Sequence, residues 1–379
     1  MPSRGHAEIA GGGLAGLVTA VALAQRGWEV CVHERSAELR MFGAGIWLWG
    51  NGIRALDSIG VFEELLKRGC QKMFGWEVRD SRDKLVWRRD AGPADPFYVA
   101  LRADLYECLI VAAREAGAQI TTSSQATAAT PDGQLHLESG EVHSADLVVG
   151  ADGVHSKIRD SLDLNGKVHE FPVGSTRLLI KRLPNEDGDV AAEHWHRGRT
   201  LLYNPVTPDY VYLCLTCPAD DLRGRQHPID KQSWAESFPR LRGVVDRIDD
   251  SGRWDLLSKA SAENWHVGKA AIVGDAAHGM PPTLGQAANT GFFNVVALAE
   301  YVTGASSVES ALRQWQRDQK PLTDHTQRWA SIYNRISHML PPSMEPVKTP
   351  FVSSLVRLPL VQRNINLAAR AALPIPTRW

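Results

Sequence analysis

The chain has 379 residues, and its 42 Lys and Arg against 43 Asp and Glu give a formal net charge of −1. This balance gives no electrostatic reason to expect nucleic acid or an anionic membrane as a partner. Its apolar runs are far shorter than the ~20 residues that span a bilayer, and its first residues lack the apolar core of a signal peptide. We expect a cytoplasmic protein, either a monomer or a homo-oligomer.

The amino terminus predicts the start of a nucleotide-binding unit. Residues 7–10 form an apolar run typical of a short strand, and Gly11-Gly12-Gly13-Leu14-Ala15-Gly16 then fits G-x-G-x-x-G. Gly11 permits the tight turn, Gly13 lets the backbone approach a pyrophosphate, and Gly16 lets helix and strand pack closely. Residues 17–25 continue as a helix.

A second strand supports this prediction. Residues 29–33 are a strand candidate that ends in Glu34. An acid at this position accepts hydrogen bonds from the ribose hydroxyls of a dinucleotide. Further along, residues 102–116 predict an amphipathic helix, and residues 134–143 predict a hairpin.

Two later strands also end in an acid. The run Leu147-Val148-Val149-Gly150 leads into Ala151-Asp152-Gly153, which by itself predicts only a strand, a turn and a helix cap. Ala270-Ala271-Ile272-Val273 leads into Gly274-Asp275. A carboxylate at the mouth of a buried strand can accept hydrogen bonds from a ribityl or ribose hydroxyl, and the helix expected after residue 284 presents its positive end to the same place.

Together, the three motifs resemble the group A flavoprotein monooxygenases, the para-hydroxybenzoate hydroxylase family, over residues 7–324. The segment 38–52 is similar to a loop of one member, 2-methyl-3-hydroxypyridine-5-carboxylate oxygenase, which oxygenates and opens a pyridine ring. The segment 203–213 is similar to the same member. The chain departs from the family at Ala287, which stands where a glycine is usual.

The resemblance implies a fold and a domain organisation. It implies an α/β protein whose Rossmann-like FAD-binding domain (1–70, 98–165 and 265–340) is interleaved with a mostly antiparallel substrate-binding sheet domain (71–97 and 166–264). Residues 341–379 would form a helical tail. The sequence from about residue 166 agrees with this sheet domain, because short apolar runs there alternate with turns that contain Pro, Asp and Gly.

The resemblance also implies an activity. It implies a single-component monooxygenase that uses NADH or NADPH and O₂ to hydroxylate, or to ring-open, a hydroxylated aromatic or hydroxypyridine substrate. The oxygen donor would be a flavin hydroperoxide. FAD would be held without a covalent bond, while NAD(P)H would visit transiently. Cys214 and Cys217 have C-x-x-C spacing, but no second pair accompanies them, and we expect no metal site.

The cofactor residues that the resemblance implies come from the glycine motif, the strand ends and two loops. They are Gly11, Gly13, Leu14, Gly16, Glu34, Arg35, Arg40, Gly45, Arg102, Asp152, Asp275, Gly285, Ala288 and Asn289.

The resemblance also implies residues that contact the substrate. They are the phenol of Tyr212, the indoles of Trp47 and Trp49, and the prolines Pro281 and Pro282, which would form a rigid wall over the flavin. Thr200 stands where the pyridine oxygenase has an arginine for the substrate carboxylate, and Arg199 beside it would face the other side of a strand. Because an unpaired buried carboxylate is costly, we expect a substrate without a carboxylate.

Two other functions remain open on the sequence. A reductase or dehydrogenase on this fold would oxidise NAD(P)H without consuming O₂. A non-catalytic flavin-binding protein would show no stimulation of flavin reduction by any phenol or hydroxypyridine.

Overall fold

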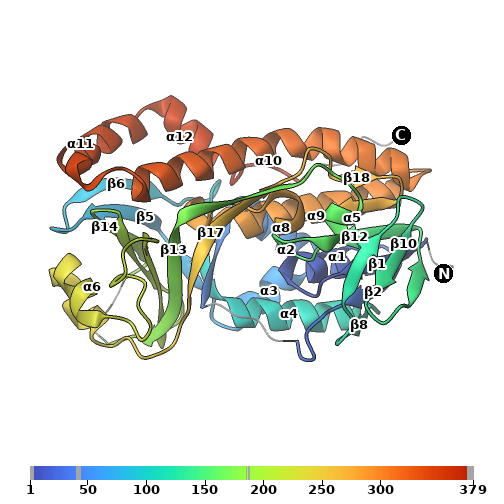
Figure 1. The fold of residues 1–379 in the computed structure, drawn as a ribbon, viewed down its shortest axis with the longest axis horizontal. Helices are drawn as coiled ribbons and strands as arrows, with labels where there is room; N and C mark the ends of the chain where they lie inside the picture. The colour runs from blue at the N-terminus through green and yellow to red at the C-terminus, as the bar shows by residue number, and fades with distance from the viewer. Residues whose placement is uncertain (1–3, 40–43, 185, 187, 374–379) are drawn as a thin grey trace.

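The structure is a computed structural model, which describes residues 4–39, 44–184, 186 and 188–373. A parallel-sheet region and an antiparallel-sheet region lie side by side along the longest axis, and the helix α10 (Val308–His338) runs along both (Figure 1). None of the helices described has the length and apolar character needed to cross a membrane.

The apolar runs of the nucleotide motifs form one six-stranded sheet. Its order is β18-β19-β12-β1-β2-β8, with parallel pairing except between β18 and β19. In that order the strands are His266–Val267, Ala270–Ile272, Leu147–Gly150, His6–Ala10, Glu29–His33 and Gln119–Thr121. The predicted α/β class is confirmed, since apolar runs that are buried on both faces are typical of parallel sheets.

Helices pack around this sheet and against one another. α1 packs against α4 and α9, and α9 packs against α10. The helices preceding α10 are α1 (Leu14–Ala24), α2 (Gly50–Ser58), α3 (Val61–Lys67), α4 (Arg102–Glu115), α5 (Lys157–Ser161), α6 (Lys231–Ser237), α7 (Arg242–Val245), α8 (Asp275–His278) and α9 (Ala287–Gly304).

Two small antiparallel sheets flank the parallel one. The predicted hairpin is present as β10 (Gln134–Leu137) and β11 (Val142–Ser144), and β9 (Ala126–Ala129) completes that sheet. The other sheet has the order β3-β7-β4, namely Gly45–Trp49, Phe97–Leu101 and Gln71–Met73. The prediction of a loop through residues 38–52 was therefore wrong for residues 45–49, which pair with β7.

The remaining strands form a seven-stranded sheet that is antiparallel except between β14 and β5. In the order β17-β13-β16-β15-β14-β5-β6, they are Trp254–Ser261, Lys167–Lys181, Tyr210–Pro218, Arg199–Pro205, Val190–His196, Gly75–Asp80 and Leu85–Asp90. Because side chains alternate along a strand, Leu213 packs toward α6 and α7, whereas Tyr212 and Cys214 face the other way.

The carboxy-terminal segment docks on the antiparallel sheet and on α10. α11 (Glu345–Val356) packs against β6, and α12 (Pro359–Asn366) packs against α10. The guanidinium of Arg54 donates to the carbonyls of Ala369 and Ala371, at 2.8 and 2.6 Å. These contacts hold the described part of the tail to α2.

Candidate active site

The glycine turn between β1 and α1 leaves open space at the N-terminal end of α1. Gly11 has φ +103° and donates to the carbonyl of His33 at 2.8 Å. A Cβ on Gly16 would lie 1.9 Å from the Gly11 carbonyl oxygen, whereas a Cβ on Gly13 would meet no heavy atom within 4 Å. Leu14 begins α1 and is buried. The turn is thus tightly packed on its inner side and open at Gly13, where a pyrophosphate would approach the helix end.

Glu34 lies across this turn at the end of β2. Its carboxylate accepts hydrogen bonds from the backbone N–H groups of Gly12 and Ser36, each at 2.8 Å. This position fits the predicted acid for a ribose. Arg35 beside it is exposed, and the predicted Arg40 lies outside the described residues.

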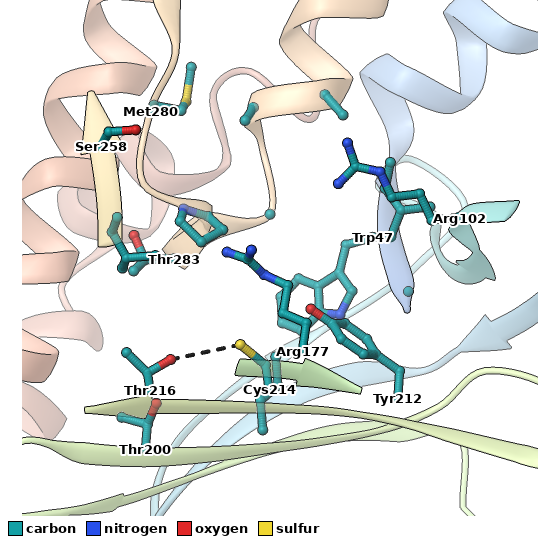
Figure 2. A pocket seen from close by; sticks show the side chains of 18 of the residues that line it. Trp47, Arg102, Arg177, Thr200, Tyr212, Cys214, Thr216, Ser258, Met280 and Thr283 are labelled. Carbon is teal, nitrogen blue, oxygen red and sulfur yellow. Dashed lines mark hydrogen bonds between the residues drawn. The ribbon is translucent and has the colours of Figure 1, made fainter. Parts of the chain in front are cut away.

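A cavity of about 320 Å³ lies between the two regions of the molecule (Figure 2). Its lining comes from both regions and includes most of the residues predicted for the flavin ring and the substrate. Predicted residues in the lining are Gly45, Trp47, Arg102, Thr200, Tyr212, Asp275, Pro282, Gly285 and Ala288.

A carboxylate and a guanidinium face this cavity. Asp275, the first residue of α8, is open to the cavity but surrounded by protein, so desolvation raises the pKa of its carboxyl, while the charge of Arg102 opposes the rise. Desolvation likewise lowers the pKa of Arg102, and Asp275 opposes that shift. The two groups therefore stabilise each other's charged forms, and Asp275 can accept a hydrogen bond from a ribityl hydroxyl.

Asn289 clamps two cavity walls together and does not point into the cavity. Its side-chain oxygen accepts from the N–H of Trp49 at 3.0 Å, and its amide donates to the carbonyls of Trp47 and Gly285, at 2.8 and 2.6 Å. These three distances are close to those typical of N–H···O hydrogen bonds. The Asn289 side chain, in the first turn of α9, therefore joins β3 to this helix and to Gly285 just before it.

Asp152 has a capping role. Its carboxylate accepts from the hydroxyl of Ser156 and from the N–H of Ile158. Both interactions lie at the start of α5, where free N–H groups need partners. Each carboxylate oxygen of Asp152 therefore has a local partner. Asp152 does not line the cavity, whereas Val154, two residues later, does.

The phenol of Tyr212 lies beside the guanidinium of Arg177 in the middle of the cavity (Figure 2). Burial raises the pKa of Tyr212, and the Cys214 thiol adds to the rise. The phenol is therefore protonated at neutral pH and can donate a hydrogen bond. A Cβ at Gly45 would lie 2.4 Å from the Tyr212 ring, so a glycine at this position leaves room for the ring.

The far end of the cavity is formed by short polar side chains on adjacent strands. Thr200 pairs with Thr216 in the β15–β16 register, and the Thr216 hydroxyl lies 3.7 Å from the Cys214 thiol (Figure 2). Glu193 and His338 also line this end. Arg199 faces away, as predicted from strand alternation, and donates to Asp221 and Ser233.

Glu193 and His338 are both buried, and burial disfavours the charged form of each side chain. The Glu193 carboxylate accepts from Trp195 Nε1 at 2.8 Å and from the Tyr333 hydroxyl at 3.1 Å, yet burial raises the pKa of Glu193 to about 7. Burial and the nearby Lys348 lower the pKa of His338 to about 3. At neutral pH, this imidazole is therefore neutral.

Two predicted substrate residues lie outside the cavity lining. Trp49 is fully buried, stacks on Phe97 with ring centroids 4.0 Å apart, and lies 3.6 Å from the guanidinium of Arg89. Trp47, two residues earlier on β3, reaches the cavity, and its indole donates to Asn204 at 2.9 Å. Pro281 is buried, and Pro282 is the member of the pair that lines the cavity.

Three charged or titratable lining residues were missed from the sequence: Arg177, Glu193 and His338. Arg177 lies on β13 and Glu193 on β14, and nothing in either segment of the sequence points to a binding site. Their places follow from the pairing of β13 with β16 and of β14 with β15. His338 ends α10, far along the chain, and no local pattern marks it.

The open glycine turn, the acid across it and the cavity at the ends of the parallel strands are features of a dinucleotide-binding enzyme. A family model described as FAD binding domain matches residues 6–328. The chain therefore belongs to this family of flavoprotein monooxygenases and is an FAD-dependent aromatic monooxygenase, for which NAD(P)H is the typical co-substrate.

Several known proteins are similar over nearly the whole chain. A probable 2-heptyl-3-hydroxy-4(1H)-quinolone synthase of Rhodococcus erythropolis is 37% identical, over 92% of this chain and 91% of the relative. A 2-heptyl-3-hydroxy-4(1H)-quinolone synthase of Mycobacteroides abscessus is also 37% identical, over 86% and 88%. The solved tetrameric form of 2-methyl-3-hydroxypyridine-5-carboxylic acid oxygenase superposes with a TM-score of 0.86 at 35% identity, over 97% of this chain and 96% of that chain.

Tyr212→Phe is expected to weaken substrate binding while leaving thermal stability nearly unchanged. The substitution removes one donor from the cavity, a loss of about 0.5–1.5 kcal/mol, or roughly a two- to tenfold rise in KM. Steady-state NAD(P)H oxidation with varied substrate measures it. Tyr210→Phe, on the same strand but exposed, is the matched control. An unchanged KM in Tyr212→Phe would mean that the phenol only packs.

Proposed function

We propose that this enzyme adds one hydroxyl group to a carboxylate-free ring of the 4(1H)-quinolone or hydroxypyridine type, beside the ring oxygen. FAD, when bound, supplies the reduction of O₂ and the transfer of one oxygen atom. The observation that carries the proposal is the uneven distribution of charge along the cavity.

Guanidinium groups line the cavity away from Thr200 and can hold a ring oxygen. Arg177 lies beside Tyr212 in the middle of the cavity, and Arg102 lines it too, with its charge partly offset by Asp275. A guanidinium and a protonated phenol are both hydrogen-bond donors. Together they favour a substrate whose ring oxygen is negatively polarised or deprotonated.

The opposite end, around Thr200, would not stabilise a carboxylate. Its described lining residues are Thr200, Leu202, Cys214, Thr216, Glu193 and His338, and they include no lysine or arginine. His338 is neutral and Glu193 is an acid. The nearby ammonium of Lys348 donates to the carbonyl of Ser337 at 2.8 Å and does not line the cavity. Burying a carboxylate there would cost several kcal/mol, whereas an uncharged or alkyl substituent fits.

The relatives support the same substrate class. Two relatives at 37% identity are named as 2-heptyl-3-hydroxy-4(1H)-quinolone synthases, so their product carries an alkyl chain and no carboxylate. A 4(1H)-quinolone is the keto tautomer of a benzo-fused 4-hydroxypyridine. Its ring carbon next to the carbonyl is electron-rich, because the ring nitrogen donates electron density to it.

The proposed reaction balances with the co-substrates of the family. One ring C–H bond becomes C–OH, O₂ supplies that oxygen atom, and the second oxygen leaves as water. NAD(P)H and one proton provide the two electrons and two hydrogens for that water. The protein's part is to orient the ring through Arg177 and Tyr212 and to exclude water behind Trp47 and Met280.

The substrate class can be tested with one quinolone and one matched pair of pyridines. We expect 2-heptyl-4(1H)-quinolone or 2-methyl-3-hydroxypyridine to stimulate NAD(P)H oxidation, with a product that gains one oxygen by mass spectrometry. 2-Methyl-3-hydroxypyridine-5-carboxylate should be turned over at least tenfold less well than its carboxylate-free partner, as a cost of several kcal/mol implies.

Thr200→Arg should narrow or reverse this preference, because it adds a cation at the far end of the cavity. Tight, coupled turnover of the carboxylate by the unaltered enzyme would contradict the assignment. A product that gains two oxygens would mean that the ring is opened. NAD(P)H oxidation without oxygen consumption would favour a reductase.

A further inference from the structure

A buried carboxylate surrounded by imidazoles lies in the parallel sheet, apart from the cavity. Glu8 is on β1 and is 2% exposed. Its oxygens lie 2.8 Å from His6 Nε2, 2.6 Å from His33 Nε2 and 3.5 Å from His143 Nδ1. Every ion pair that the structure shows for Glu8 is thus with a histidine. Buried carboxylates need a charged partner or a metal ion.

Three of these groups converge closely enough to share one ion. The ligand atoms of Glu8, His33 and His143 all lie within 4.8 Å of one another. Ligands in a tetrahedral zinc site lie about 2 Å from the ion and therefore a little over 3 Å apart. Only small shifts would bring the three groups to that spacing. They come from β1, β2 and β11, and so from two different sheets.

His33 is already oriented as metal-bound histidines are. Its Nδ1 lies 2.8 Å from the hydroxyl of Ser124, which turns Nε2 toward Glu8. A second partner of this kind fixes the tautomer and the ring plane of a ligand. The His33 and His143 rings are 5.0 Å apart, so both imidazoles meet at one side of the carboxylate.

We propose that Glu8, His33 and His143 bind a Zn²⁺ ion, with water as a fourth ligand. Two imidazoles and one carboxylate are a ligand set that suits zinc. Further acids lie around the cluster: Glu29 lies 3.9 Å from His6, Glu141 lies 3.9 Å from His143, and Asp146 accepts from the N–H of His6. Their negative charge attracts cations.

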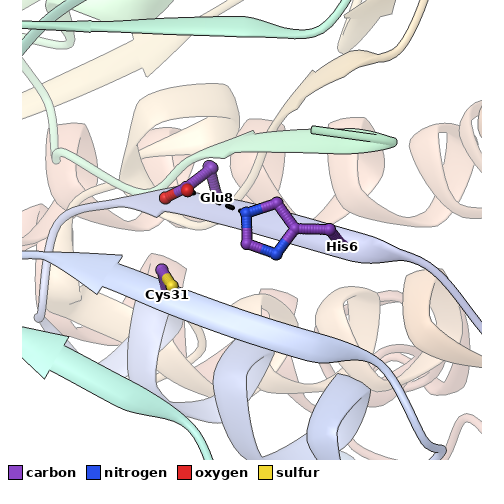
Figure 3. A group of neighbouring side chains, drawn as sticks. All are labelled: His6, Glu8 and Cys31. Carbon is purple, nitrogen blue, oxygen red and sulfur yellow. Dashed lines mark hydrogen bonds and ion pairs between the residues drawn. The ribbon is translucent and has the colours of Figure 1, made fainter. Parts of the chain in front are cut away.

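The same carboxylate takes part in a second arrangement, with His6 and Cys31 (Figure 3). The two arrangements share Glu8, so one ion would use one or the other. We place the ion with His33 and His143, because His33 is 5% exposed and fixed by Ser124, whereas the His6 side chain is 27% exposed. This ion would cross-link β11 to the parallel sheet next to Glu34.

The test uses tag-free FAD-loaded enzyme, stripped with a chelator and titrated with Zn²⁺ against a chromophoric chelator. We expect one saturable site per chain and a Zn²⁺-dependent rise in the unfolding temperature. His143→Gln should weaken Zn²⁺ binding roughly 100-fold or more, since even loss of a group that only orients a ligand costs 10–100-fold. It should also remove the temperature rise. The His143 side chain is 37% exposed, so this variant is expected to fold.

Two controls separate this site from its alternatives. Cys31→Ser and His169→Gln, a change to an exposed histidine on β13, should both bind Zn²⁺ as the unaltered enzyme does. Three results would overturn the proposal: no saturable binding, unchanged binding in His143→Gln, or loss of binding in Cys31→Ser. These measurements do not depend on turnover, so their outcome is independent of whether the proposed substrate is correct.

Discussion

Gly13→Val is expected to give a folded protein that retains no FAD. A Cβ at Gly13 meets no protein atom within 4 Å, and its φ of −74° suits any residue, so nothing in the fold opposes the branched side chain. The methyl groups would instead fill the open place above α1, where the pyrophosphate must approach the backbone. Absorbance of the purified protein, with the FAD-to-protein ratio after reconstitution, measures the loss.

Two comparisons make this result specific. Gly92→Val also meets nothing within 4 Å and lies far along the chain, so it should keep FAD. Gly16→Val should instead fail to fold, because its Cβ would lie 1.9 Å from a backbone carbonyl oxygen. A yellow, FAD-loaded Gly13→Val protein would show that the dinucleotide does not cross this turn.

Asp275→Ala is expected to weaken FAD binding and to divert reducing equivalents into hydrogen peroxide. The substitution removes a charged hydrogen-bond acceptor, worth about 1.5–3 kcal/mol, or roughly 10- to 150-fold in affinity. It also removes the carboxylate that offsets the charge of Arg102. FAD titration of the apoprotein and peroxide formed per NAD(P)H consumed measure the two effects.

The matched control is Asp57→Ala, which removes an exposed carboxylate on α2. It should leave both FAD affinity and peroxide release unchanged. Normal affinity together with full coupling in Asp275→Ala would show that the carboxylate at the start of α8 does not contact the cofactor.

The nucleotide-binding end of the molecule could be predicted from the sequence. Gly11, Gly13, Gly16 and Glu34 lie within one stretch of chain, and a strand, a tight turn and a helix are fixed by local backbone geometry. The predicted strands and glycine turn are present in the parallel sheet. The interleaved α/β class was implied by the resemblance that these motifs carry, and it is confirmed.

Several assignments near the cavity could not be made from local patterns. The sequence predicts a loop at residues 45–49, but pairing with β7 makes them a strand. Trp49 resembled a substrate residue, yet it packs on Phe97 and Arg89. The side-chain amide of Asn289, a residue predicted for the flavin, joins β3 to α9. In each case, the deciding partner is distant in sequence.

Neighbouring residues alone fix the dinucleotide motif, and they also fix the alternation that turns Thr200 toward one face of the sheet and Arg199 toward the other. Only the tertiary structure placed Arg177, Glu193 and His338 on the cavity, and only it brought Glu8, His33 and His143 together. Strand pairing decides such contacts, because a shift of one residue in register turns every side chain to the opposite face.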